Sequence, residues 1–425
     1  MHSLLRGLLG LAVGDLRDNR NFTLVWASAT VSGLGAQVSQ LAIPLIAATL
    51  LHATPSQMGL LVACETLPFA LFSLPAGVWL DRVKTRPIVL YGELAAAALL
   101  LSIPLCAWLG WLGFALLYAV SFGIGSTLAV SSAAAQMLVA RLVERDQLVA
   151  ANARLQVTWS AATLIGPGIG GMLVQLLTAP FAILLDGLCL FLSAGFIART
   201  RFTEASPAGD EPAFFGELLA GLRFVWGDHT LRGVTLSVAL LSLVLHGYFA
   251  LQVLFATREL GMSAGDLGLA LMIGGAGALL AGAISTGLAA RIGIGRVLVF
   301  GYALTALGWT AIAFLPPSQT AGTLVLGLGI GVFEFGQTLF VVSYVSLRQA
   351  LTPDHMLGRV IGTMRFLTVA PAPVGALVGG WLAEQVGIRP ALGVLAICGW
   401  LLTAHVALLT PVRNIRNLNA ARSTV

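Results

Sequence analysis

The chain contains 425 residues, of which 58% are hydrophobic and 10% are charged, and its formal net charge is +5. A soluble domain carries about 25% charged residues, so this composition excludes an ordinary water-soluble protein. At about 20 apolar residues per crossing, the length accommodates about a dozen transmembrane helices. Long apolar runs such as 94–105 lack the alternation of a membrane β-barrel, and we therefore expect an all-α integral membrane protein.

Hydropathy predicts twelve membrane-spanning helices in two sets of six, separated by the longest polar stretch of the chain. The first set covers 22–50, 55–80, 87–108, 111–138, 148–177 and 180–198. The second set covers 231–257, 264–290, 297–315, 320–347, 357–386 and 390–409. We expect an N-terminal bundle over 1–198, a cytoplasmic linker over 199–230 and a C-terminal bundle over 231–425. Within the linker, 214–226 is amphipathic and is predicted to lie as a helix along the membrane surface.

The basic residues predict how the chain is oriented in the membrane. Of the 23 Lys and Arg residues, all but Arg258 and Arg389 fall on the side that carries both termini and the linker. Because positive charge is retained in the cytoplasm, we expect both chain ends on the cytoplasmic side of a bacterial inner membrane. This topology and contact with anionic lipid explain the positive net charge, so no nucleic-acid partner is expected.

The two halves carry related glycine motifs. The segment GPGIGG at 166–171 and the segment GALVGG at 375–380 share the form GxxxGG. This spacing aligns small residues on one helix face, and a proline allows the helix to bend, so each segment is interpreted as a packing site or hinge that seals the core. The residues concerned are Gly166, Pro167, Gly170, Gly171, Gly375, Gly379 and Gly380. Parallel six-helix repeats of this kind build one large class of secondary transporters.

The loop after the second predicted span reads GVWLDRVKTR at 77–86. It resembles the loop signature of the major facilitator superfamily, and the GPxxGG form of 166–171 resembles a signature of the proton-coupled drug antiporters in that superfamily. The segments NRNF at 19–22, AIP at 42–44 and LP at 67–68 resemble the bacterial branch of macrolide-type drug exporters and the enterobactin exporter. The resemblance covers essentially the whole chain and implies two pseudo-symmetric six-helix bundles around a central cavity.

Two features depart from the superfamily pattern. The segment 121–136 lacks the arginine-bearing signature that many proton antiporters carry in the fourth span, and the echo of the loop motif after the eighth span lacks its aspartate. The sequence therefore leaves open how protons would be coupled to transport.

The loop motif is predicted to act as a conformational latch at the cytoplasmic end of the bundles. Asp81 can meet the positive N-terminal end of a helix in the other half, and Gly77 allows the helices to approach closely. The alternative, a solvated basic cluster, explains Arg82 and Arg86 but not Asp81. The predicted latch and gate residues are Gly77, Asp81, Arg82, Arg86, Arg154 and Arg365. For the last two, snorkelling or pairing near the gate is preferred over binding of an anionic substrate.

Ionisable groups inside the predicted spans are the sharpest indication of a site. An ionised acid at membrane depth costs about 2.5–3.5 kcal/mol, so each acid is expected to face a cavity or a partner. The candidates for proton coupling or substrate binding are Glu65, Asp186, Glu334 and His246. The candidates for cavity lining, which share helix faces with these groups or with each other, are Gln37, Gln40, Phe69, Phe72, Gln337 and Tyr344. The alternative for each acid is a hydrogen-bonded structural group, and a lone buried histidine is more often neutral.

These patterns favour a secondary transporter that exports a hydrophobic or amphiphilic small molecule in exchange for protons. Export of a siderophore or another organic anion, a non-transporting sensor or scaffold, uptake by symport and lipid flipping remain alternatives. The sequence contains no phosphate-binding loop of the form GxxxxGK[ST] and no clustered metal ligands, so neither an enzyme, nor a cofactor, nor a metal site is expected. The expected partners are the small-molecule substrate, protons and the lipid bilayer, and the protein is expected to be a monomer.

Overall fold

The computed structural model describes residue 16 and residues 19–80, 83–144, 146–202, 214–316, 322–353 and 356–415. Within these ranges the regular secondary structure is helical, and twelve segments are long and apolar enough to cross a membrane. The predicted all-α membrane fold with twelve spans is therefore confirmed.

The first six spans are α2 (Arg20–Leu45) with the π-helical turn η2 (Ile46–Leu50), α3 (Pro55–Leu80), α4 (Thr85–Trp108), α5 (Phe114–Leu142), α6 (Leu148–Leu177) and α7 (Ala179–Arg199). The last six are α9 (His229–Leu254) with the π-helical turn η3 (Phe255–Glu259), α10 (Ala264–Ile292), α11 (Ile294–Ala313), α12 (Gly322–Leu351), α13 (Leu357–Val369) with α14 (Ala372–Val386), and α15 (Ile388–Leu409). The short 3-10 helix η5 (Pro411–Asn414) follows.

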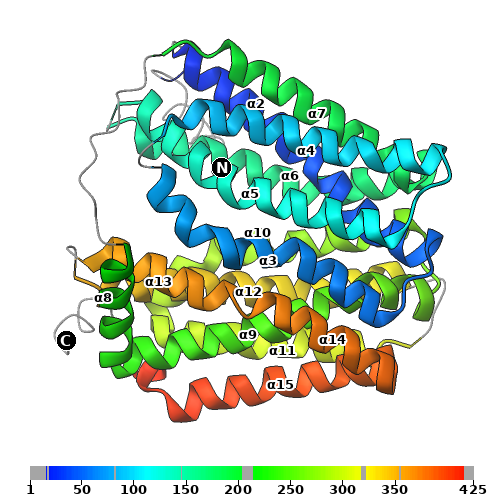
Figure 1. Cartoon of the computed structure of the whole chain (residues 1–425). Helices are drawn as coiled ribbons and strands as arrows, with labels where there is room; N and C mark the ends of the chain where they lie inside the picture. Colours follow the sequence, from blue (N-terminus) through cyan, green and yellow to red (C-terminus); the bar gives the residue numbers. More distant parts are fainter. Residues whose placement is uncertain are drawn as a thin grey trace, which may run out of the picture.

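The spans form two bundles that lie side by side (Figure 1). In the first bundle α2 packs on α6 and α7, while α4 packs on α5 and α7. The second bundle repeats these contacts, because α9 packs on α14 and α15, while α11 packs on α12 and α15. Between the bundles in sequence, α8 (Phe214–Gly227) runs across the ends of the spans and packs on α13 and α9 (Figure 1). This helix covers the linker segment for which an amphipathic helix is predicted.

The two bundles repeat each other in local detail at a constant separation of 209 residues. The Asn19 side chain caps α2, and the Asp228 side chain caps α9. Each of these helices ends in a five-residue π-turn, η2 or η3. A residue with positive φ then follows, His52 in the first bundle and Gly261 in the second. Side-chain caps satisfy free N–H groups at a helix start, so the same backbone devices begin and end the equivalent spans.

The eleventh span differs from its predicted form. The sequence predicts one helix over 357–386, whereas the structure divides it into α13 and α14 at Ala370 and Pro371. Proline has no N–H to donate and its ring crowds the preceding turn, which explains the break. The equivalent span of the first bundle, α6, remains continuous through Pro167.

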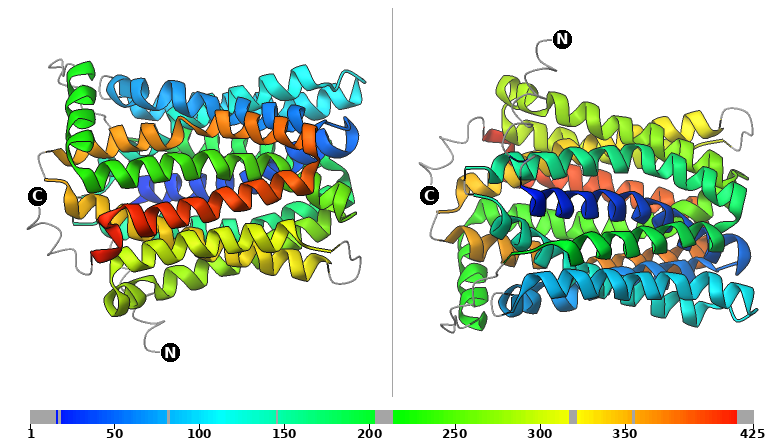
Figure 2. Two further views of the ribbon diagram at one scale, coloured as in Figure 1. Left: turned by 90° about the horizontal axis from the view of Figure 1, so that it is seen from below. Right: turned by 90° about the horizontal axis from the view of Figure 1, so that it is seen from above.

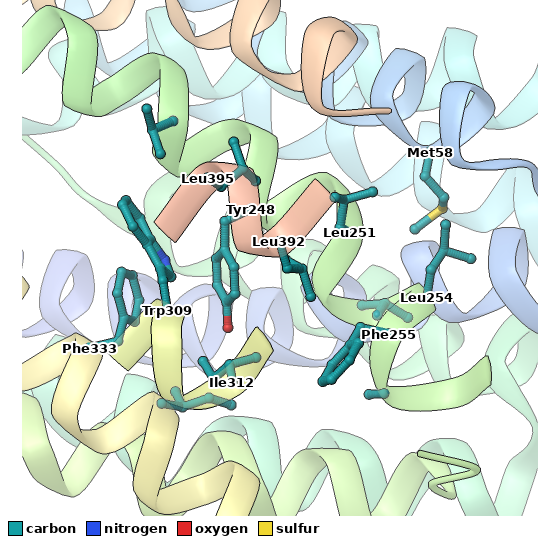
Figure 3. Close-up of a cluster of buried hydrophobic side chains, with 14 of the residues drawn as sticks. Met58, Tyr248, Leu251, Leu254, Phe255, Trp309, Ile312, Phe333, Leu392 and Leu395 are labelled. Atoms are coloured by element: carbon teal, nitrogen blue, oxygen red, sulfur yellow. The ribbon is translucent and has the colours of Figure 1, made fainter. Parts of the chain in front are cut away.

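An aromatic cluster lies in the core of the second bundle (Figure 3). The Tyr248 and Phe333 ring centroids lie 5.4 Å apart, and Trp309 stacks on Phe333 at 5.8 Å. All three side chains are buried. Large rings in contact contribute both buried area and ring–ring attraction, so this cluster fixes how α9, α11 and α12 pack.

Candidate transport pathway

The two bundles touch along two seams at one end of the molecule. Figure 2 shows the start of α2 and the end of α15 together at the opposite end, which we call the terminal end. The α6–α10 seam joins Gly171 to Gly268, where a Cβ added at Gly171 would lie 2.9 Å from the Gly268 Cα. The α3–α14 seam joins Gly380 to Gly59, where a Cβ added at Gly380 would lie 3.0 Å from the Gly59 Cα. We call the end that carries these seams the sealed end.

The GxxxGG motifs build both seams in the same way. In α6, Gly166 and Gly170 pack on Gln37 and Val38 of α2, and Gly171 faces α10 across the seam. Pro167 also faces the seam, since its carbonyl oxygen lies against Gly268. In the second bundle, Gly375 packs on Leu243 of α9, Gly379 packs on Gly247 of α9, and Gly380 faces α3. Two glycines of each motif thus hold the bundle together, and the last one brings the two bundles into backbone contact.

A cavity of about 460 Å³ lies between α2, α5 and α6, in the half of these helices nearer the terminal end. Its lining residues are Ala29, Gly33, Gln136, Asn152, Leu155, Gln156, Thr158, Trp159 and Ala162. Three of them carry carboxamide groups and none is charged, while Trp159 supplies a large, exposed aromatic face. Gly33 lies beside that face, since a Cβ at this position would be in ordinary van der Waals contact with the Trp159 ring at 3.9 Å. Amide groups and an indole suit an uncharged ligand with polar and apolar parts.

Two of the predicted acids face the interior of the molecule without an ion-pair partner in the described part of the chain. Glu65 lies at the middle of α3, deep inside the protein, and its side chain is nevertheless accessible to solvent. The Glu65 backbone carbonyl packs on Gly125 of α5. Glu334 of α12 is partly buried and lies near the hydroxyl group of Tyr248. Glu65 therefore belongs to the first bundle and Glu334 to the second.

Asp186 belongs to a different environment, a buried polar cluster inside the first bundle. Its side chain is 2% exposed and lies beside Glu93 of α4 and Ser39 of α2. Ser193 lies next to Glu93, and its hydroxyl is 2.6 Å from the Ser28 hydroxyl. In the described structure, Asp186 Oδ1, Glu93 Oε2 and Ser39 Oγ have no hydrogen-bond partner. Two carboxyl groups are therefore held together among hydroxyl groups, away from the cavity.

His246 stands at the position in α9 that Gln37 occupies in α2. Its Nδ1 donates a hydrogen bond to the Ser242 carbonyl oxygen at 2.8 Å, and its ring meets Phe249 edge-on at 5.8 Å between centroids. These contacts match the structural alternative that the sequence leaves open for a lone histidine.

The predicted cavity-lining residues divide into two groups. Gln40 is exposed, and Phe69, Phe72 and Gln337 are partly buried. Gln37 and Tyr344 are buried, contrary to the expectation that they line the cavity in this state. Gln37 lies under Gly166 in the α2–α6 interface, and Tyr344 stacks on Phe340 with the Arg348 guanidinium over its ring. Helical spacing predicts that both residues lie on polar helix faces, but in the structure neighbouring side chains and helices cover them.

The predicted latch is only partly within the described residues. Asp81 and Arg82 lie outside them, and Gly77 belongs to the last turn of α3. Arg86 donates to the carbonyl oxygens of Ile197 and Ala198, which end α7 in the same bundle. A cation at a helix C-terminus is favourable, so Arg86 ties α4 to α7.

The two arginines of the predicted gate lie in different surroundings. The Arg154 guanidinium lies 5.1 Å from the Trp26 ring centroid. The Trp26 indole N–H donates a hydrogen bond to the hydroxyl of Thr158, which lines the cavity. Arg365 is exposed on α13. The structure does not bring the two arginines together.

Sequence reasoning missed several residues of this pathway. Glu93 lies in an apolar span just as Glu65 does, and the cost of a buried acid would have singled it out. Gln136, Asn152, Gln156 and Trp159 are spaced over two helices, and only their joint exposure to one cavity distinguishes them from surface residues.

The comparisons with known proteins agree with this architecture. The chain matches the family described as transmembrane secretion effector over residues 14–424. The multidrug efflux pump Tap of Mycolicibacterium fortuitum is 28% identical over 423 residues, which cover 94% of this chain and 97% of Tap. The multi-drug resistance efflux pump PmrA of Streptococcus pneumoniae is 24% identical over 345 residues, which cover 80% of this chain and 82% of PmrA.

Two solved structures share the fold at low sequence identity. A bacterial homologue of the iron transporter ferroportin in an inward-facing state has a TM-score of 0.71 at 17% identity, covering 93% of this chain and 98% of that one. An inward-facing, unoccupied bacterial homologue of the lysosomal transporter Spinster has a TM-score of 0.68 at 14% identity, covering 93% and 98%. Both likenesses concern the arrangement of the spans.

Proposed function

The chain belongs to the transmembrane secretion effector family of major facilitator transporters, and we propose that it exports a hydrophobic or amphiphilic small molecule in exchange for protons. Relatives named as multidrug efflux pumps support the direction of transport. The mechanism would be alternating access, in which the two bundles rock about a central site and open it to one side at a time.

The observation that carries the proposal is the asymmetry between the two ends of the molecule. Glycine seams bring the bundles into backbone contact at the sealed end, while the cavity lies in the half of the first bundle nearer the terminal end. We place the terminal end and α8 in the cytoplasm, because nearly all basic residues lie there. In this orientation we interpret the structure as the inward-open state, which would take up a substrate for export from the cytoplasm or the inner leaflet.

The lining of the cavity supports an uncharged, amphiphilic substrate. Gln136, Asn152 and Gln156 offer both donors and acceptors, and Trp159 offers a flat apolar surface. The charge-free lining leaves no carboxylate to attract a cationic drug or arginine to attract an anion at this position. Selectivity would then rest on shape and on a few amide hydrogen bonds, as expected for a carrier that accepts several compounds.

Proton coupling needs a carboxyl group that can be reached from each side in turn. Glu65 fits this requirement best, because it is exposed to the interior and lies on α3, one helix of the α3–α14 seam. Glu334 and the Glu93–Asp186 pair are the other candidates, and their lower exposure suits groups that open only during the conformational change. We therefore assign Glu65 the proton-carrying role.

The test is accumulation of fluorescent or radiolabelled drugs in everted membrane vesicles under an imposed gradient that is acid inside. Wild type is expected to accumulate an uncharged macrolide, and Glu65→Gln is expected to lose this uphill accumulation. The same variant should still exchange labelled for unlabelled substrate at equal concentrations, because exchange requires no net proton movement. Loss of both activities would instead assign Glu65 to substrate binding or folding.

Matched variants separate the remaining roles. Trp159→Ala should raise KM about 2- to 10-fold without changing the gradient dependence, since an aromatic contact contributes about 0.5–1.5 kcal/mol. Glu334→Gln, Glu93→Gln and Asp186→Asn identify the coupling acid if Glu65→Gln retains accumulation. Siderophore accumulation lost in Arg154→Gln or Arg365→Gln would favour the organic-anion alternative. A purified, folded protein that moves none of these compounds would favour the sensor or scaffold.

A further inference from the structure

Each seam at the sealed end is closed by a side-chain oxygen that binds the start of a helix in the other bundle. At the α3–α14 seam, Glu384 Oε2 accepts a hydrogen bond from the Ser56 backbone N–H at 2.9 Å and from the Thr54 hydroxyl at 3.0 Å. The exposed Glu384 side chain therefore bridges α14 to the first turn of α3. Free N–H groups at a helix start are good donors to an anion, and the helix dipole adds to the attraction.

The α6–α10 seam repeats this arrangement with a neutral acceptor. Gln175 Oε1 accepts from the Gly265 backbone N–H at 3.1 Å and lies 3.4 Å from the Ser263 hydroxyl. The Ser263 hydroxyl is also 2.7 Å from Asp266 Oδ2, with which it forms a capping box, so it is shared. Gln175 and Glu384 are 209 residues apart, as are the groups they bind, but one is an amide and the other a carboxylic acid.

We propose that Glu384 is the proton-responsive residue of the outer gate. Its ionised carboxylate holds the α3–α14 seam closed through charge-assisted hydrogen bonds, and a proton taken up from the outer solution weakens them and favours opening. The Gln175 amide does not take up a proton, so the seam that it closes serves as the less pH-sensitive side of the gate. This inference rests on the proposed function, which places the sealed end outside and the bundles in alternating access.

In the described part of the chain, the other charged or titratable groups around the sealed end are His52, Tyr118, Arg258, Glu259, Asp266 and Arg389. The Tyr118 hydroxyl donates to the Gln57 carbonyl oxygen in the first turn of α3. Arg389 forms an ion pair with Glu259 at 2.9 Å, and Arg258 donates to the Ala53 carbonyl oxygen at 2.7 Å across the bundles. Asp266 is held in its capping box. His52 lies in the loop before α3, two residues from Thr54, so a variant at this position serves as a control.

The test measures the distance between the bundles at the sealed end in the full-length protein, reconstituted in lipid nanodiscs without substrate. Spin labels would be attached through Trp111→Cys and Phe314→Cys, two exposed positions in different bundles, after replacing the four native cysteines by serine. Because a glutamic acid side chain in water is half-protonated at about pH 4.3, the pH must be lowered from neutral to about 3.5. This should raise the population with separated labels about three- to fivefold, approaching the ratio expected when a charge-assisted hydrogen bond becomes a neutral one.

Two variants exchange the chemistry of the seams. Glu384→Gln retains an acceptor oxygen and should abolish the pH response. Adding Gln175→Glu to Glu384→Gln moves the carboxylate to the other seam and should restore the response. His52→Gln should leave the response as in wild type. A wild-type response in Glu384→Gln, or its loss in His52→Gln, would overturn the proposal.

Transport by the same labelled proteins separates this proposal from the proposed function. If wild type exports substrate but the distance between its spin labels does not change with pH, the gate proposal fails and the proposed function stands. If the distances respond as expected but no compound moves in the vesicle assay, the gate proposal stands and the export function fails.

Discussion

The two bundles share their backbone devices but bury different side chains at equivalent positions. The aromatic residues Tyr248, Trp309 and Phe333 of the second bundle stand where the first bundle has Ser39, Leu100 and Ile124. Likewise, Tyr302 and Leu395 stand where the first bundle has Glu93 and Asp186. One core is therefore built from packed rings, and the other contains a pair of carboxyl groups surrounded by hydroxyl groups.

This difference shows which features the fold requires and which it leaves free. Helix caps, π-turns and seam glycines occur in both bundles, because they determine where the spans begin, bend and touch. The interior between α4 and α7 accommodates acids, whereas the equivalent space between α11 and α15 accommodates rings. We interpret the second bundle as the more rigid body and the first as the one that contains ionisable chemistry.

The largest effect is expected from removing a ring of the aromatic cluster. Trp309→Ala should lower the free energy of unfolding by about 3–5 kcal/mol, because a buried tryptophan leaves a large void that its neighbours cannot fill. Trp309→Phe is the control, since it keeps a ring and removes an indole N–H that has no partner in the described structure. Thermal unfolding in detergent would measure both. Equal melting temperatures for Trp309→Ala and wild type would show that this core is not rigid.

An intermediate effect is expected from exchanging an acid between the equivalent positions. Leu395→Asp should cost about 2.5–3.5 kcal/mol, because it places a carboxyl group at a buried, packed position inside the membrane-spanning bundle. Asp186→Asn, which keeps the shape of the side chain among its hydroxyl neighbours, should leave the melting temperature near that of wild type. The same thermal unfolding assay applies. If Leu395→Asp were as stable as wild type, the contrast between the two cores would not determine where an acid is accepted.

Much of the fold followed from the sequence because long apolar runs, basic loops and repeated glycine motifs are local signals. Twelve spans and the packing role of Gly166 and Gly375 needed no tertiary information beyond helix geometry. The break at Pro371 was not predicted from the sequence. Because α6 passes through Pro167 without a break, proline alone does not determine whether a membrane helix is divided.

The candidate site was less predictable because it depends on which helix faces remain open. Gln37 and Gln40 share a helix and differ by one turn, yet Gln37 is covered by Gly166 and Gln40 is exposed. The bridging oxygens of Gln175 and Glu384 lie at span ends among other polar residues, where no hydropathy signal marks them. Aligning the two halves with an offset of 209 residues places Gln175 opposite Glu384. Only the structure shows that each side chain accepts a hydrogen bond from the other bundle.

The smallest effect concerns the turns that precede α7 and α15. Thr178 has φ 67° and ψ 155°, and its equivalent Gly387 has φ 92° and ψ 161°. Glycine adopts this region freely, whereas a residue with a Cβ is strained there by about 1–3 kcal/mol.

Thr178→Gly should therefore raise the free energy of unfolding by about 1 kcal/mol, because relief of strain outweighs the added freedom of the unfolded chain. Gly387→Thr should lower it by a similar or larger amount. Thr178→Ala retains the Cβ and should bring no gain, so melting temperatures of the three variants separate backbone strain from loss of the threonine side chain. If Thr178→Gly melted below Thr178→Ala, the threonine would be accommodated without strain, and the two turns would not be equivalent in energy despite their matching backbone angles.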